Sequence, residues 1–115
     1  DVRVFDELDR LLGDPELVTP RAVVSELGRL AGNGSREARA ARVGLDLADE
    51  RCRVVEPDGY DAAANDGDDA LVALAEAGAV DFVVTNDRLL RDRLLEARVP
   101  VIGVRGRNTL AITEP

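Results

Sequence analysis

Short apolar segments alternate with longer amphipathic segments along this chain, and the alternation limits the possible folds more than any other feature. The clearest apolar segment, residues 82–85, reads Phe-Val-Val-Thr without polar alternation. Such runs are typical of strands that are buried on both faces of a parallel sheet. Further strands are expected at residues 16–19, 53–56, 99–104 and 110–113.

The segments between these strands predict helices, because their apolar residues recur at helical spacing or their residues have high helix propensity. Thr19 and Pro20 are the residue types that favour the N-cap and the first position of a helix. Ser35 and Asn86 are expected to cap two later helices. The expected helices span residues 4–12, 20–31, 36–49, 68–77 and 87–97.

Alternating strands and helices predict an α/β fold in which a mainly parallel central sheet lies between two layers of helices. The strand at residues 82–85 is expected at or near the centre of this three-layer α/β/α arrangement. The length of 115 residues suits a single domain over residues 1–115. Residues 57–67, rich in Asp, Asn and Gly, are expected to form a loop.

Missing residue types narrow the chemistry that is available. The absence of His excludes Ser-His and Cys-His nucleophiles and histidine-bound metals. The absence of Lys excludes a Lys Schiff base and the Lys of a phosphate-binding loop. Cys52 is the lone cysteine, so a cysteine cluster for zinc cannot form. What remains is a carboxylate site, and carboxylates with water favour Mg²⁺ or Mn²⁺.

Asp87 directly follows the strand at residues 82–85, in the turn into a helix. Ligands of open α/β sheets bind outside the carboxyl ends of the strands, which is where this acid lies. An acid at this position also complements the helix dipole. Asp87 alone is therefore explained by either role.

Two other acidic positions can also be explained either by ligand binding or by a structural role. Asp66, Asp68 and Asp69 crowd the start of a helix, where one of them can serve as N-cap. Crowded carboxylates repel one another unless a divalent cation lies among them or the solvent screens them. Glu26 lies within a helix, beside its apolar face. Its other explanation is an ordinary surface acid paired with Arg29 or with a neighbour such as Arg36.

Four motifs, taken in order, resemble the PIN domain, a family of ribonucleases. They are Ser-Glu-Leu at 25–27, Asp-Asp-Ala-Leu-Val-Ala-Leu-Ala at 68–75, Val-Val-Thr-Asn-Asp-Arg-x-Leu at 83–90 and Val-Pro-Val-Ile-Gly-Val-Arg at 99–105. The resemblance covers nearly the whole chain and is strongest to small archaeal members related to rRNA-processing nucleases of the small ribosomal subunit. Each motif is short, so the strength lies in their order and spacing.

The resemblance implies a set of acidic site residues, because PIN domains hold four acids around one or two Mg²⁺ or Mn²⁺ ions. Glu26 matches the second acid of the family. Asp68 or Asp69 matches the third, with a one-residue ambiguity, and Asp87 matches the fourth. All four residues are thus implied as catalytic and metal-binding, and we expect them to converge in space.

Further residues are implied around this acidic centre. Thr85 and Asn86 match a segment that supports the site. Arg88 and Arg105 are the main candidates for contacts with the RNA backbone, and Arg91 and Arg107 are further ones.

The family's first acid belongs to an N-terminal strand of the form Leu-Asp-Thr-Asn, which this chain does not contain. The sequence also contains no Met, so it does not begin at a translation start. We therefore expect that a central strand and one acid precede Asp1. The chain without them is expected to bind metal weakly and to cut little RNA.

The implied function is a metal-dependent endoribonuclease that hydrolyses RNA phosphodiester bonds, with a role in rRNA processing on ribosomal precursor particles. One alternative with the same fold and site is a toxin nuclease that an antitoxin protein inhibits. Another is a non-catalytic PIN scaffold in a ribonucleoprotein. A receiver-like phosphoacceptor domain is disfavoured because it needs a distal Lys. PIN domains often dimerise, so a homodimer is a further expectation.

The net charge of −8 predicts repulsion between this surface and nucleic acid. All 15 basic residues are Arg, however, and an acidic, Lys-free composition is of the halophilic type, where high salt screens such repulsion. GC-rich coding also favours Arg over Lys. No apolar stretch approaches the ~18–20 residues of a membrane span, and a single cysteine suits a reducing setting. A cytoplasmic protein without a membrane partner is expected.

Overall fold

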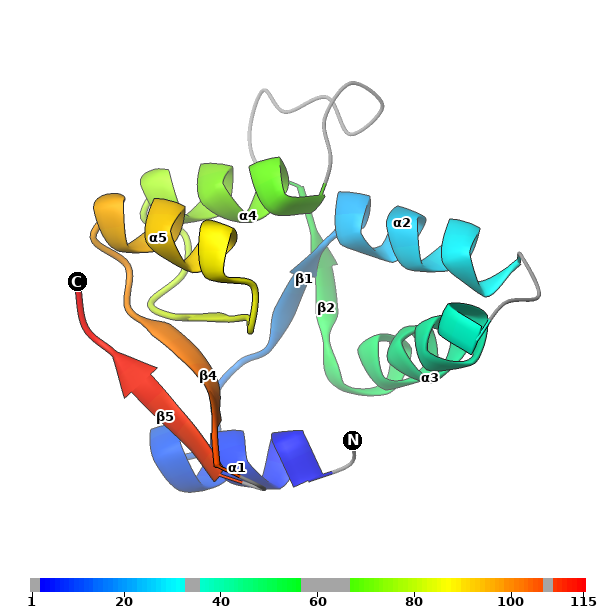
Figure 1. Ribbon diagram of the computed structural model, residues 1–115, viewed down its shortest axis with the longest axis horizontal. Coiled ribbons are helices and arrows are strands. Elements are labelled where there is room, and N and C mark those ends of the chain that lie inside the picture. Colours follow the sequence, from blue (N-terminus) through cyan, green and yellow to red (C-terminus); the bar gives the residue numbers. More distant parts are fainter. Residues whose placement is uncertain (1–2, 33–35, 57–66, 107–108) are drawn as a thin grey trace. The chain divides into compact units, whose positions relative to one another are not determined.

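The computed structural model describes residues 3–32, 36–56, 67–106 and 109–115 of the chain (Figure 1). In these residues helices and strands follow one another largely as the sequence predicts. The helices are α1 (Arg3–Leu12), α2 (Arg21–Ala31), α3 (Arg36–Arg51), α4 (Gly67–Glu76) and α5 (Arg88–Glu96). The strands are β1 (Val18–Pro20), β2 (Arg53–Val55), β3 (Val83–Val84), β4 (Val101–Arg105) and β5 (Thr109–Thr113). No helix in the described ranges is long and apolar enough to cross a membrane.

The chain divides into two compact units, one made of Asp1–Pro15 with Leu74–Pro115 and the other of Glu16–Ala73. The division falls inside α4. A single domain over residues 1–115 stays a prediction.

The Glu16–Ala73 unit contains a parallel pair of strands and a pair of packed helices. β1 pairs with β2, with Val18 opposite Arg53. α2 and α3 pack side by side (Figure 1). Arg42 of α3 donates a hydrogen bond of 3.0 Å to the Ala31 carbonyl, one of the carbonyls that a helix end leaves without an internal partner. Two helices therefore connect two neighbouring parallel strands, as α/β crossovers do.

The other unit is built around β4. Its sheet has the order β3-β4-β5, with β3 parallel to β4 and β5 antiparallel to it. Val101 and Ile102 of β4 are buried almost completely, as is Leu94 of α5. β4 rather than β3 is therefore the central strand of this sheet.

The expectation that residues 82–85 form a central strand, buried on both faces, is wrong for this sheet. β3 comprises only Val83 and Val84 and pairs with one neighbour, β4, in the described part of the chain. Val83 is buried, but the side chain of Val84 is 45% exposed. An apolar run shows that a strand is present, but it does not show which strand lies at the centre.

Two predicted helix caps are also wrong. Pro20, not Thr19, occupies the N-cap position of α2, no side chain caps the helix, and Arg21 is its first residue. Asp87, not Asn86, is the N-cap of α5. Ser35, the third predicted cap, lies outside the described residues, as do residues 57–66 of the expected loop.

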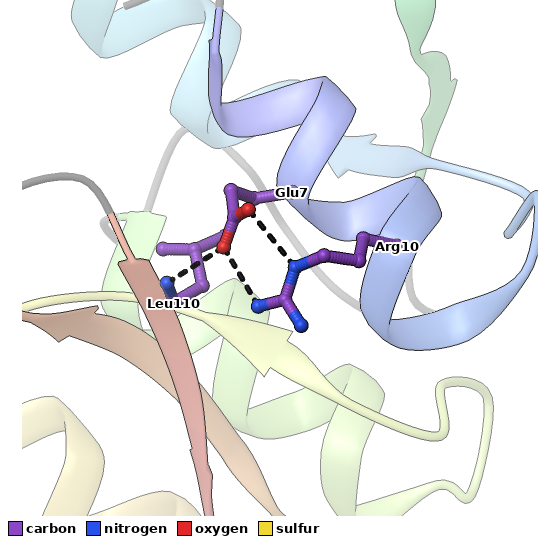
Figure 2. Close-up of polar contacts among 3 residues, drawn as sticks. All are labelled: Glu7, Arg10 and Leu110. Atoms are coloured by element: carbon purple, nitrogen blue, oxygen red, sulfur yellow. Dashed lines mark hydrogen bonds and ion pairs between the residues drawn. The ribbon is translucent and has the colours of Figure 1, made fainter.

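Glu7 connects α1 to β5 within its unit (Figure 2). Its Oε2 accepts a hydrogen bond of 3.2 Å from the Leu110 N–H and one of 2.9 Å from Arg10 Nη2. The hydrogen bonds from Arg10 and from the Leu110 backbone lower the pKa of the Glu7 carboxyl from 4.5 to about 2. The ionised carboxylate thus holds the first helix against the last strand.

This low pKa makes stability depend on pH. A carboxyl whose pKa is lower in the folded state contributes stability above its unfolded pKa and loses it as the pH falls through the folded value. From pH 5 to pH 2 we expect Glu7→Gln to lose less stability than the wild type, because Gln has no charge to titrate. Urea unfolding across this range measures the effect. Asp9→Asn, on the same helix, is the control. If the free energy of unfolding of Glu7→Gln fell with pH as steeply as that of the wild type, Glu7 would not be the group responsible.

Candidate carboxylate site

Glu26 and the start of α4 come together within the Glu16–Ala73 unit. Glu26 Oε1 accepts a hydrogen bond of 2.7 Å from the backbone N–H of Gly67, 41 residues away in the chain. Asp68 and Asp69 follow in the first turn of α4, both half-buried. Two of the predicted acidic positions therefore meet at one helix end. Asp66 lies outside the described residues.

Asp87 lies in the other unit, in the turn between β3 and α5. Its Oδ1 accepts a hydrogen bond of 2.9 Å from the Leu90 N–H, which caps α5. Its own N–H donates to Thr85 Oγ1 at 3.1 Å. The structural role of a helix cap is thus real for Asp87. It does not exclude metal binding, because a carboxylate has two oxygens and about four acceptor positions.

Thr85 and Asn86 fix this turn to β4. The Thr85 N–H donates to the Ile102 carbonyl at 3.0 Å, which continues the pairing of β3 beyond Val84. Asn86 Oδ1 accepts a hydrogen bond of 2.8 Å from the Val104 N–H. The two residues predicted to support the site therefore both form hydrogen bonds to β4, immediately before Asp87 in the chain.

Two glycines, each beside candidate residues of its own unit, were not predicted: Gly103 lies against Thr85 and Asn86, and Gly67 lies against Glu26. A Cβ atom at Gly103 would lie 3.1 Å from the Thr85 carbonyl oxygen and 3.3 Å from Asn86 Oδ1, so β4 passes very close to the turn. The sequence does contain a clue to this close approach. Gly103 lies inside an apolar strand, and a glycine in that position often marks a place where another backbone segment comes close. Gly67 was assigned to a loop, yet it is the first residue of α4.

The arginine candidates belong to the unit that contains Asp87. Arg88 is the first residue of α5 and Arg105 the last of β4, and both are exposed. Arg91 forms an ion pair with its neighbour, with 3.6 Å between Arg91 Nε and Asp92 Oδ1. Arg107 lies outside the described residues. A cation in the first turn of a helix opposes the helix dipole, so helix stability does not explain Arg88.

Hard divalent cations prefer oxygen ligands, and the candidate residues offer only carboxylates, which fit Mg²⁺ or Mn²⁺. Across the ranges that the structure describes, no three Cys, Asp or Glu side chains lie close enough together to hold a metal ion. The convergence of Asp87 with Glu26, Asp68 and Asp69 thus stays a prediction.

The Asn86 contact predicts a measurable effect on stability. Asn86→Ala leaves the Val104 N–H without its side-chain acceptor, and we expect a loss of about 1 kcal/mol, the usual net value of one hydrogen bond. Asn86→Asp keeps an acceptor oxygen and serves as the control. Urea unfolding of both variants makes the comparison. Equal stability of Asn86→Ala and the wild type would show that this contact does not hold the turn.

Comparison with known proteins identifies the fold around these residues. The family model described as "PIN like domain" matches residues 1–107. The chain belongs to the PIN-like domain family. A solved structure titled "Structure of the PIN domain endonuclease Utp24" matches with a TM-score of 0.77 and 23% sequence identity, over 97% of this chain and 78% of that chain. No curated protein gives a significant match.

These findings confirm the predicted resemblance and the predicted fold class. The chain has the PIN-type α/β fold, in which two of the three strand pairings described are parallel. At 23% identity, the likeness to Utp24 concerns the fold alone.

Proposed function

We propose that this PIN-like domain is a divalent-metal-dependent endoribonuclease that hydrolyses phosphodiester bonds in RNA. The observation that carries the proposal is Asp87 in a doubly anchored turn after a parallel strand, in a chain that belongs to the PIN-like family. That one solved relative of this fold is titled an endonuclease supports the same conclusion. The absence of His and Lys removes the main competing catalytic schemes.

The acids have distinct roles in this proposal. Asp87, together with Asp68 or Asp69, would hold Mg²⁺ or Mn²⁺, and Glu26 would complete the site. A metal bound there would lower the pKa of a water molecule, which makes that water a better nucleophile. Its positive charge would also offset the negative charge that develops on the phosphate. The turn that Thr85 and Asn86 anchor would keep Asp87 oriented through the reaction. Arg88 and Arg105 would contact RNA phosphates, and the products would carry 5′-phosphate and 3′-hydroxyl ends.

The biological role belongs to the same proposal. The motif resemblance favours rRNA processing on ribosomal precursor particles, whereas a toxin nuclease would need an antitoxin partner. A non-catalytic scaffold in a ribonucleoprotein is the remaining alternative. It requires that RNA binds without being cut.

Metal-dependent cleavage tests the proposal. The full-length protein is incubated with 5′-labelled single-stranded RNA with Mg²⁺, with Mn²⁺ or with excess EDTA. We expect internal cleavage with either metal and none in EDTA, because carboxylates alone cannot acidify water. Cleavage that persists in EDTA would contradict the proposal. Binding without cleavage would favour the scaffold.

Arg88 provides a prediction for RNA binding. Arg88→Ala removes one phosphate contact, so RNA affinity should fall and the slope of log affinity against log salt should decrease by about one unit. The variant should unfold at the same urea concentration as the wild type or slightly higher, because a cation has left the helix N-terminus. Arg29→Ala, at the C-terminal turn of α2, is the control. An unchanged salt slope in Arg88→Ala would remove Arg88 from the RNA-binding surface.

A further inference from the structure

Glu26 supplies from α2 the acceptor that the start of α4 lacks. The first four N–H groups of a helix have no acceptor inside it, and the N–H of Gly67, the first residue of α4, is one of these. Glu26 Oε1 accepts it at 2.7 Å. This is within the short distances of hydrogen bonds to a charged carboxylate. A residue of another helix thus serves as the cap of α4.

α2 also fits closely against this helix end. Gly67 is buried, and a Cβ atom there would lie 2.9 Å from Val23 Cγ2 and 3.2 Å from Glu26 Oε2. Val23 is held stiffly, because a β-branched side chain in a helix has one strongly preferred rotamer. The glycine therefore lets the Glu26 carboxylate approach the backbone directly. The positive end of the α4 dipole offsets the charge of this carboxylate.

We infer that Glu26 is a positioning residue, which acts through Asp68 and Asp69 by fixing the start of α4. This inference rests on the proposed function, since it assigns a role within the same site. Gly67 immediately precedes the two aspartates, so a shift of its backbone moves both. A positioning role needs an acceptor oxygen at Glu26, whereas a metal-ligand role needs its negative charge.

Glu26→Gln and Glu26→Ala separate these requirements in the full-length protein. Gln keeps an acceptor oxygen without the charge, and Ala loses both. Glu50→Ala, an exposed acid of α3, is the control. Hydrogen exchange of the Gly67 amide reports the cap, and titration with Mn²⁺ alone reports the metal site.

In Glu26→Ala the Gly67 amide should exchange roughly tenfold to a hundredfold faster than in the wild type, as expected for losing a hydrogen bond to a charged group. Mn²⁺ affinity should fall by about tenfold or more, as for other residues that orient metal ligands. Glu26→Gln should keep most of the Gly67 protection, and its Mn²⁺ affinity should stay within about threefold of the wild type. The control should match the wild type in both measurements.

Two results would overturn the inference. Equal exchange of the Gly67 amide in the wild type and in Glu26→Ala would show that Glu26 is not the cap. Equal losses of Mn²⁺ affinity in Glu26→Gln and Glu26→Ala, with Gly67 still protected in Glu26→Gln, would show that the charge of Glu26 binds metal. A wild type that binds no Mn²⁺ would instead remove the proposed metal site, while the exchange of Gly67 would still decide whether Glu26 caps α4.

Discussion

Replacing Asp87 with Asn is expected to abolish RNA cleavage by the full-length protein while leaving its stability close to that of the wild type. Asn is as good an N-cap as Asp, so its side-chain oxygen can still accept the Leu90 N–H. It loses, however, the negative charge that binds a hard cation. Loss of a metal that both acidifies water and offsets phosphate charge should lower the cleavage rate on the order of 10³-fold or more.

The rate with saturating Mg²⁺ or Mn²⁺ is the measurement, and thermal unfolding is its control. Asp92→Asn, on the same helix, removes an equal charge from an exposed position and should cleave at the wild-type rate. Cleavage by Asp87→Asn within a few-fold of the wild type would mean that Asp87 only caps α5.

Leu94→Ala is expected to have the largest effect on stability. The Leu94 side chain is 0% exposed, and truncating a fully buried Leu costs about 2–5 kcal/mol through lost burial and the cavity left behind. Leu89, on the same helix, is 79% exposed, so Leu89→Ala should change the free energy of unfolding by less than about 0.5 kcal/mol.

Urea unfolding of these two variants compares one chemical change at two depths of burial. The midpoint should fall sharply for Leu94→Ala with little change in slope. Similar midpoints for the two variants would contradict the described packing of α5.

The sequence predicted which segments form helices and strands because periodicity and glycine stop signals are local. Gly13, for example, has a φ of 68° directly after α1, a backbone conformation that favours glycine. The pairing of strands depends on residues far apart in the chain. The prediction from the sequence therefore placed β3 at the centre of its sheet, which is wrong. The central strand is β4, with Val101 and Ile102 buried.

The candidate site shows the same division. The acids were identified from residue type, spacing and family resemblance. Asp87 was expected either to bind a ligand or to complement the helix dipole, whereas the N-cap of α5 was predicted at Asn86 and lies at Asp87. The contact between Glu26 and the Gly67 N–H could not be predicted, since it joins residues 41 positions apart and depends on how α2 approaches the start of α4. Capping positions were off by one residue at both α2 and α5. At α5 two neighbouring polar residues, Asn86 and Asp87, could each cap the helix, and Asp87 does so. At α2 the N-cap is Pro20 and no side chain caps the helix, so the residue type of Thr19 was misleading.

The central prediction is that one metal ion binds both Asp87 and the acids at the start of α4. Mn²⁺ broadens the NMR signals of nearby amides, so titrating the full-length protein with Mn²⁺ reports every segment near the ion. We predict that the amides of Asp68, Asp69 and Asp87 broaden together at the same Mn²⁺ concentrations, and that Asp87→Asn weakens the broadening of all three. Broadening of Asp68 and Asp69 that is unaffected by Asp87→Asn, or no broadening at Asp87, would contradict the shared carboxylate site.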